Sequence, residues 1–227
     1  MKTRIPSHKL RPRGVRGVSL AEVLVGGALS LMALSALYAF QVAQARSLAV
    51  ENTYNDSQNI TRTAIDLMSR ELRMATYDPS GLALTTSLPP ICPGVKQGIT
   101  EAAVNRIHFR QDLNGDGLLL GAGEDVVYDV SGTDLRRTDG LNAPVAIVTG
   151  IPSGGFALRY FDGSNPPVEI IPGGIPPQLN ASQRDCVAKV RMTITANLAN
   201  PNPKITTPVL SQAETEIAIR NRSLGNF

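Results

Sequence analysis

The chain has 227 residues, which is long enough for one globular domain with an added segment or for two small domains. Its formal net charge is +3, but six Lys and Arg residues lie within residues 1–17, and without these six charges the net charge becomes −3. The remaining chain is mildly acidic and has 4% aromatic residues with no Trp, which argues against a basic or stacking surface for nucleic acids.

The first predicted element is a membrane-spanning helix. Residues 23–42 contain no Asp, Glu, Lys, Arg or His, and at about 1.5 Å rise per residue they match a hydrocarbon core of about 30 Å. The basic residues before this run predict a cytoplasmic N-terminus and an exported C-terminal part. The A-x-A pattern at residues 43–45 is typical of signal-peptide cleavage, but the apolar run exceeds the roughly 7 to 15 residues of a signal peptide. We therefore expect a retained, single-pass inner-membrane anchor with a periplasmic head.

The apolar run begins with the sequence Gly17-Val18-Ser19-Leu20-Ala21-Glu22. A carboxylate within an apolar helix costs about 2.5 to 3.5 kcal/mol, so Glu22 should have a partner. The alternative is that Glu22 lies near the cytoplasmic interface and reaches water. A basic segment, a glycine and a glutamate five residues later resemble the class III leader of type IV pilins and type II secretion pseudopilins.

This resemblance implies a processing site and an assembly residue. In the family, prepilin peptidase cuts after the glycine and methylates the new N-terminus, so Gly17 would end the leader and Val18 would be methylated. Glu22 would then pair with the N-terminal amine of a neighbouring subunit in a fibre. Val18 departs from the usual phenylalanine and Ala21 from the usual isoleucine, which are variants tolerated in minor members of the family.

An amphipathic helix is predicted to follow without interruption. Residues 46–76 show apolar or small residues at steps of three and four, which is typical of a helix with one buried stripe. No Gly or Pro interrupts residues 28–77, so we predict one helix over both parts, ending before the turn formers at 78–81. The stripe consists of Val50, Tyr54, Ser57, Thr61, Ala64, Met68, Leu72 and Ala75.

The rest of the chain, residues 78–227, is predicted to be a mainly β head. Its composition shifts to Gly, Pro, Thr and β-branched residues, and the alternation over 186–198 is typical of a half-buried antiparallel strand. We predict loops at 88–93, 172–177 and 200–208. The predicted strands are 106–110, 125–129, 134–137, 145–148, 156–161, 168–171, 186–198 and 214–219.

The head also resembles the larger minor members of the family, the PilW type of minor pilin and the J-type pseudopilin. The matching segments are 66–73, 127–128 with 135–137, 156–162, 187–194 and 219–222. The resemblance implies an α+β fold in which a long N-terminal helix packs against an antiparallel sheet. The chain would divide into a leader (1–17), a transmembrane half-helix (18–45), an amphipathic half-helix (46–77) and the head (78–227).

Two cysteines, Cys92 and Cys186, fall in the exported part. In an oxidising compartment they can pair, and the chain-entropy model gives about 4 to 5 kcal/mol for closing so long a loop. Two free buried thiols are the alternative.

The segment 110–118 contains the D-x-N-x-D-G opening of a calcium-binding loop. The acid expected at the twelfth position is displaced by one residue, and Asn-Gly and Asp-Gly are also common in tight hairpin turns that bind nothing. We therefore hold a calcium site and a plain hairpin as alternatives. The proposed ligands are the side chains of Asp112, Asn114 and Asp116, the carbonyl of Leu118, and Glu124 or Asp125.

Catalytic residues are not expected. His108 is the only histidine after the leader, and it lies in a strand pattern, which favours an ordinary sheet position over a general base. The chain has no G-x-S-x-G, P-loop, H-E-x-x-H or C-x-x-C motif.

Three functions follow as expectations. The first is a minor pilin that is processed by prepilin peptidase, contacts other pilins through its helix, and helps to initiate, cap or decorate a type IV pilus at the cell surface. The second is a J-type pseudopilin of a type II secretion system, which the same residues fit. The third, of another class, is a membrane-anchored periplasmic binding or sensor protein, for which Gly17 and Glu22 would be coincidences.

Overall fold

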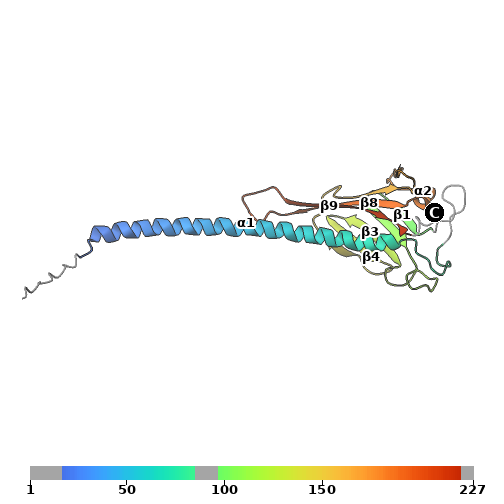
Figure 1. The fold of residues 1–227 in the computed structure, drawn as a ribbon, viewed down its shortest axis with the longest axis horizontal. Helices are drawn as coiled ribbons and strands as arrows, with labels where there is room; N and C mark the ends of the chain where they lie inside the picture. Colours follow the sequence, from blue (N-terminus) through green and yellow to red (C-terminus); the bar gives the residue numbers. More distant parts are fainter. Residues whose placement is uncertain (1–16, 85–96, 221–227) are drawn as a thin grey trace, which may run out of the picture. The chain divides into compact units, whose positions relative to one another are not determined.

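The computed structural model describes residues 17–84 and 97–220. Internal contacts divide the chain into two compact units, residues 1–47 and residues 48–227. The predicted single helix is confirmed: α1 (Leu20–Met74) is 55 residues long, and the boundary between the units falls within it. Figure 1 shows α1 and the strands that follow it in the sequence.

The end of α1 lies three residues before the predicted one. The amide of Tyr77 donates to the Met74 carbonyl at 2.9 Å, which tightens the last turn, and Thr76 has a φ of 70°. A left-handed residue at this position ends a helix. The turn formers of 78–81 therefore follow the helix end rather than make it.

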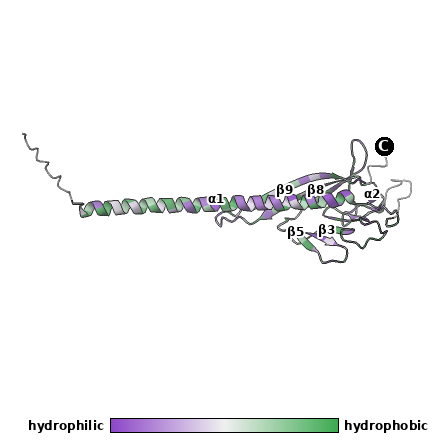
Figure 2. Ribbon diagram, turned by 60° about the horizontal axis from the view of Figure 1, so that its bottom comes forward, coloured by the Kyte–Doolittle hydropathy of each residue, from purple (hydrophilic) through white to green (hydrophobic). Residues whose placement is uncertain are grey.

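In the first unit, α1 exposes its apolar side chains. It contains an 18-residue window apolar enough to cross a membrane, and none of that window is buried. Figure 2 shows hydrophobic residues along this half and more hydrophilic residues in the second half of α1. By length and composition the helix can span a bilayer, as predicted.

In the second unit, most of the predicted stripe is buried, whereas Val50 is only half-buried. Ser57, Thr61, Ala64, Met68, Leu72 and Ala75 are all buried, and Ile65 joins them. The prediction was wrong for Tyr54, whose side chain is 42% exposed. Small residues at 57, 61 and 64 and large ones at 65, 68 and 72 give the helix a single buried face.

A five-stranded antiparallel sheet follows, with strand order β1-β2-β3-β4-β5. Inward residues alternate with outward ones, as in β2, where Ile107 and Phe109 are buried, and the cross-strand register sets Tyr128 of β3 opposite Arg137 of β4. The strands are β1 (Ile99–Ala102), β2 (Arg106–Arg110), β3 (Asp125–Ser131), β4 (Asp134–Asp139) and β5 (Val145–Val148).

A second antiparallel sheet has four strands in the order β7-β6-β8-β9. Its strands are β6 (Phe156–Phe161), β7 (Glu169–Ile170), β8 (Lys189–Leu198) and β9 (Val209–Ala218). The segments 200–208 and 172–177 lie outside the named strands, as predicted. The α+β class with antiparallel strands is thus confirmed, with the strands divided between two sheets.

Two short elements were not predicted. They are β1, which pairs with β2, and α2 (Ala181–Asp185). The N-terminus of α2 has a capping box. The Asn180 side chain accepts from the Gln183 amide, and the Gln183 side chain accepts from the Asn180 amide.

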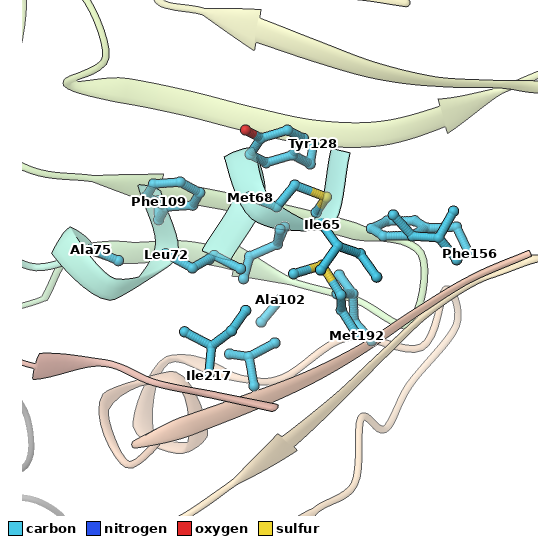
Figure 3. Packing of buried hydrophobic residues seen from close by; sticks show 14 of the residues in the cluster. Ile65, Met68, Leu72, Ala75, Ala102, Phe109, Tyr128, Phe156, Met192 and Ile217 are labelled. Carbon is cyan, nitrogen blue, oxygen red and sulfur yellow. The ribbon is translucent and has the colours of Figure 1, made fainter. Parts of the chain in front are cut away.

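One hydrophobic core joins α1 to both sheets. Met68 and Leu72 of α1 lie among Phe109 and Tyr128 of the five-stranded sheet and Met192 of the four-stranded sheet (Figure 3). All five side chains are fully buried. At about 1.5 to 3 kcal/mol for each fully buried large side chain, this cluster is the main stabilising element of the second unit.

Candidate functional site

The predicted processing segment precedes α1. Gly17, Val18 and Ser19 are exposed and not helical, and Val18 is 73% exposed. A Cβ built on Gly17 would meet no atom within 4 Å, and its φ lies outside the left-handed region. The described structure therefore gives no steric or backbone reason for glycine at this position.

Glu22 has a partner within its own helix. Its Oε2 accepts from the backbone amide of Ser19 at 3.0 Å, and its own amide donates to Ser19 Oγ at 3.2 Å. These reciprocal bonds form a capping box, which sets the first residue of α1. The sequence analysis missed the role of Ser19, although the S-x-x-E spacing signals it.

Three acidic side chains organise the predicted calcium loop. Asp112 is fully buried and accepts from the amides of Gly115 at 2.7 Å and Gly117 at 3.1 Å, and from Ser80 Oγ at 3.0 Å. Asp116 accepts from the Leu118 amide at 2.7 Å. Carboxylates that accept from several nearby backbone amides in this way hold a loop in its turns.

Glu124 closes the same loop from its other end. Its carboxylate accepts from the amides of Leu113 at 3.0 Å, Asn114 at 3.3 Å and Gly121 at 2.6 Å. A Cβ on Gly121 would lie 2.6 Å from this carboxylate, so a side chain there would displace the carboxylate from its present position.

Asp125 is directed elsewhere. It contacts His108 and lies 3.4 Å from Arg110 Nε. Within residues 17–84 and 97–220, no group of three or more His, Cys, Asp and Glu side chains is placed to hold a metal ion. Binding of calcium by Asp112, Asn114, Asp116, Leu118 and Glu124 or Asp125 stays a prediction.

A polar cluster connects α1 to the five-stranded sheet. The Arg137 guanidinium donates to Glu71 Oε1 from Nη2 at 2.8 Å and from Nε at 3.0 Å, and the Tyr128 hydroxyl donates to Glu71 Oε2. Burial and the neighbouring Glu71 carboxylate raise the pKa of Tyr128. The Glu71 side chain is only 17% exposed, and the sequence analysis gave this residue no role.

The cluster continues into the loop. Arg137 Nη1 lies 3.2 Å from Asp139, whose other carboxylate oxygen accepts from the Gly123 amide at 2.8 Å. The position of Glu71 on the helix is therefore coupled through two side chains to the end of the carboxylate-rich loop.

His108 lies on β2, at the place predicted. Its imidazole contacts Asp125, and Arg106 on the same strand pairs with Glu101 at 2.7 Å and Asp129 at 3.3 Å. Such partly exposed cross-strand ion pairs contribute about 0 to 1 kcal/mol each.

The cysteines are described in part. Cys186, the C-cap of α2, is disulfide-bonded. Cys92 lies outside the described residues, so the pairing of these two cysteines stays a prediction.

A cavity of about 600 Å³ opens in the second unit near the β3–β4 turn. Its polar side chains are Asn105, Thr133 and Ser153, and no ionisable side chain lines it. The two hydroxyls therefore have no neighbouring base within the cavity to activate them.

A comparison of the chain with models of protein families, with curated proteins and with solved structures found no match.

Proposed function

We propose that this protein is a minor pilin, a structural subunit that prepilin peptidase cleaves between Gly17 and Val18 and that helps to initiate, cap or decorate a type IV pilus. Its layout would then be pilin-like, with α1 as the membrane and assembly segment and the two sheets as the head. The protein would stay in the inner membrane until it joins other pilins.

The observation that carries the proposal is Gly17. Neither space nor backbone conformation in the described structure demands glycine there, so the bare Cα at this position is free to serve a molecule that binds the segment. A peptidase whose site accepts only a bare Cα before the scissile bond is such a molecule. The bond itself lies in exposed, non-helical chain, where a protease can reach it.

The apolar half of α1 supports the same proposal. Leu24, Leu29 and Leu34 are 65%, 61% and 62% exposed, and an unpartnered surface of this kind needs lipid or other apolar helices around it. A minor pilin meets both environments in turn, first the membrane and then the fibre.

The proposal is tested at the N-terminus. The full chain is expressed in a host that has prepilin peptidase, extracted from membranes, and its N-terminal peptide is identified by mass spectrometry. We expect a chain that begins with N-methylated Val18. Gly17→Val should leave the leader attached, because a β-branched side chain does not fit a site shaped for glycine.

The matched control is Gly26→Val, since Gly26 also has no atom within 4 Å of a built Cβ and lies beyond the cleavage site. It should be processed normally. A chain that still begins at Met1, or one that begins after Ala45, would refute the pilin proposal and favour the anchored binding or sensor protein.

The J-type pseudopilin is separated from the minor pilin by phenotype. Deletion of the protein in its natural host should remove surface pili if it is a minor pilin. Loss of extracellular enzymes with pili retained would instead assign it to a type II secretion system.

A further inference from the structure

The loop at residues 111–124 holds a pair of neighbouring residues whose chemical reactivity plays no part in pilus assembly or in calcium binding. Asn114 is followed by Gly115, and the side chain of Asn114 is exposed. In an Asn-Gly pair the backbone nitrogen of glycine can attack the side-chain amide carbon, because no side chain on glycine obstructs the approach. We propose that Asn114 is a self-deamidating site whose reaction is promoted by the folded loop.

The nucleophile has a base in place. The Gly115 amide donates to Asp112 Oδ1 at 2.7 Å, and Asp112 is fully buried, so its carboxylate is held on this amide rather than free in water. A carboxylate at hydrogen-bond distance from the proton to be removed meets the geometric requirement for a general base.

The electrophile is polarised by a second contact. Asn114 Oδ1 accepts from the Asp116 amide at 2.9 Å, so a donor already points at the oxygen on which negative charge develops during attack. Asn114 Nδ2 donates to Asp116 Oδ2 at 2.9 Å, which orients the leaving nitrogen. Base, oxyanion donor and leaving-group acceptor thus surround one side chain.

The reaction balances with water as the only co-reactant. As the Gly115 nitrogen forms a bond to Asn114 Cγ, its proton passes to Asp112. The Cγ–Nδ2 bond then breaks, and the nitrogen leaves as ammonia after taking up that proton. Water opens the resulting succinimide at either carbonyl and leaves aspartate or isoaspartate at position 114.

The product changes the charge of the loop. The Asn114 amide that donates to Asp116 at 2.9 Å becomes a carboxylate. A hydrogen bond is thereby replaced by repulsion between two neighbouring carboxylates. The D-x-N-x-D pattern of the predicted calcium loop would gain a further acidic ligand when aspartate forms, and this step would be a timed, irreversible modification of the head.

The test compares the folded and unfolded protein. The full chain in detergent is incubated at neutral pH, with and without guanidinium, and the peptide that contains residue 114 is quantified by mass spectrometry for loss of the amide. We expect the folded chain to deamidate at least about tenfold faster than the unfolded chain, a fraction of the effect that general bases commonly give. Deamidation at an equal or lower rate in the folded chain would overturn the proposal.

Two variants identify the base. Asp112→Asn should reduce the folded rate at least about tenfold. Glu124→Gln is the matched control, because Glu124 is equally buried in the same loop but contacts the amides of Leu113, Asn114 and Gly121 and not that of Gly115. An unchanged rate in Asp112→Asn, or an equal fall in both variants, would overturn the assignment of Asp112.

Discussion

The two halves of α1 differ in which side chains they expose and which they bury. In the first unit, leucines such as Leu29 and Leu34 are more than 60% exposed, whereas in the second unit the same helix buries Ser57 and Thr61 completely or nearly so. Burial along α1 therefore depends on what the helix packs against and not on side-chain hydrophobicity alone. The second half has a core to enter, and the first half presents its apolar surface to whatever surrounds it.

Truncation of one leucine in each half should give the largest difference in unfolding free energy. Leu72→Ala should lower the free energy of unfolding of the head by about 2 to 5 kcal/mol, because it leaves a cavity in a fully buried cluster. Leu29→Ala should leave that free energy unchanged. Denaturant titration of the full chain in detergent, followed by near-UV circular dichroism, measures both. Equal losses in the two variants would contradict the contrast between the halves.

Alkaline pH should weaken the second unit through its buried tyrosines. Burial raises the pKa of Tyr128 and of Tyr160, so above pH about 10 the unfolded chain loses protons that the folded head keeps. The contribution is fully present below that pH, and each tyrosine should then cost about 1.4 kcal/mol per pH unit. The slope of unfolding free energy against pH measures this cost, and Tyr128→Phe should halve it. A slope that does not change in this variant would contradict the prediction.

The polar cluster around Glu71 should give a smaller effect. Glu71→Gln removes the charge that accepts from Arg137 and Tyr128, and should lower the unfolding free energy by about 1.5 to 3 kcal/mol. Glu51→Gln, an exposed acid on the same helix, is the control and should change it little. Equal effects of the two substitutions would contradict a stabilising role for the contacts of Glu71.

The smallest effect is expected at the start of the first half. Ser19→Ala removes the side-chain cap of α1 and should cost about 1 kcal/mol, confined to the first turn. Faster amide hydrogen exchange at residues 20–23, with unchanged unfolding of the head, is the expected result. Protection that stays the same would show that Ser19 does not cap the helix in its natural surroundings.

Local patterns were readable from the sequence, and this accounts for most of the secondary structure. The predicted strands 106–110, 145–148 and 156–161 match β2, β5 and β6 residue for residue, because side-chain alternation and turn residues act over a few positions. β9 begins five residues before its predicted start, since the polar Ser211 stands at an inward position and the apolar Leu210 at an outward one, which hides the alternation.

The candidate sites also divide into those that a local sequence signal reveals and those that depend on contacts between distant residues. Gly17, Val18 and Glu22 stand out as a motif because their spacing in the chain is the signal. The partners of Glu71 and Asp112 were not foreseen. Glu71 meets Arg137, which is 66 residues away in sequence, and Asp112 meets Ser80, which is 32 residues away.

The sequence by itself determined the apolar segment, the single helix, the antiparallel strands and the reactive Asn-Gly pair, because each depends on neighbouring residues. The tertiary structure alone decided that the strands form two sheets and that α1 enters one core with both of them. It also decided which acidic side chains accept hydrogen bonds from the loop backbone, and that Asp112 accepts from the Gly115 amide. These outcomes depend on how segments far apart in sequence pack. That packing is selected by total burial and by the pairing of buried polar groups, and no short window of residues contains this information.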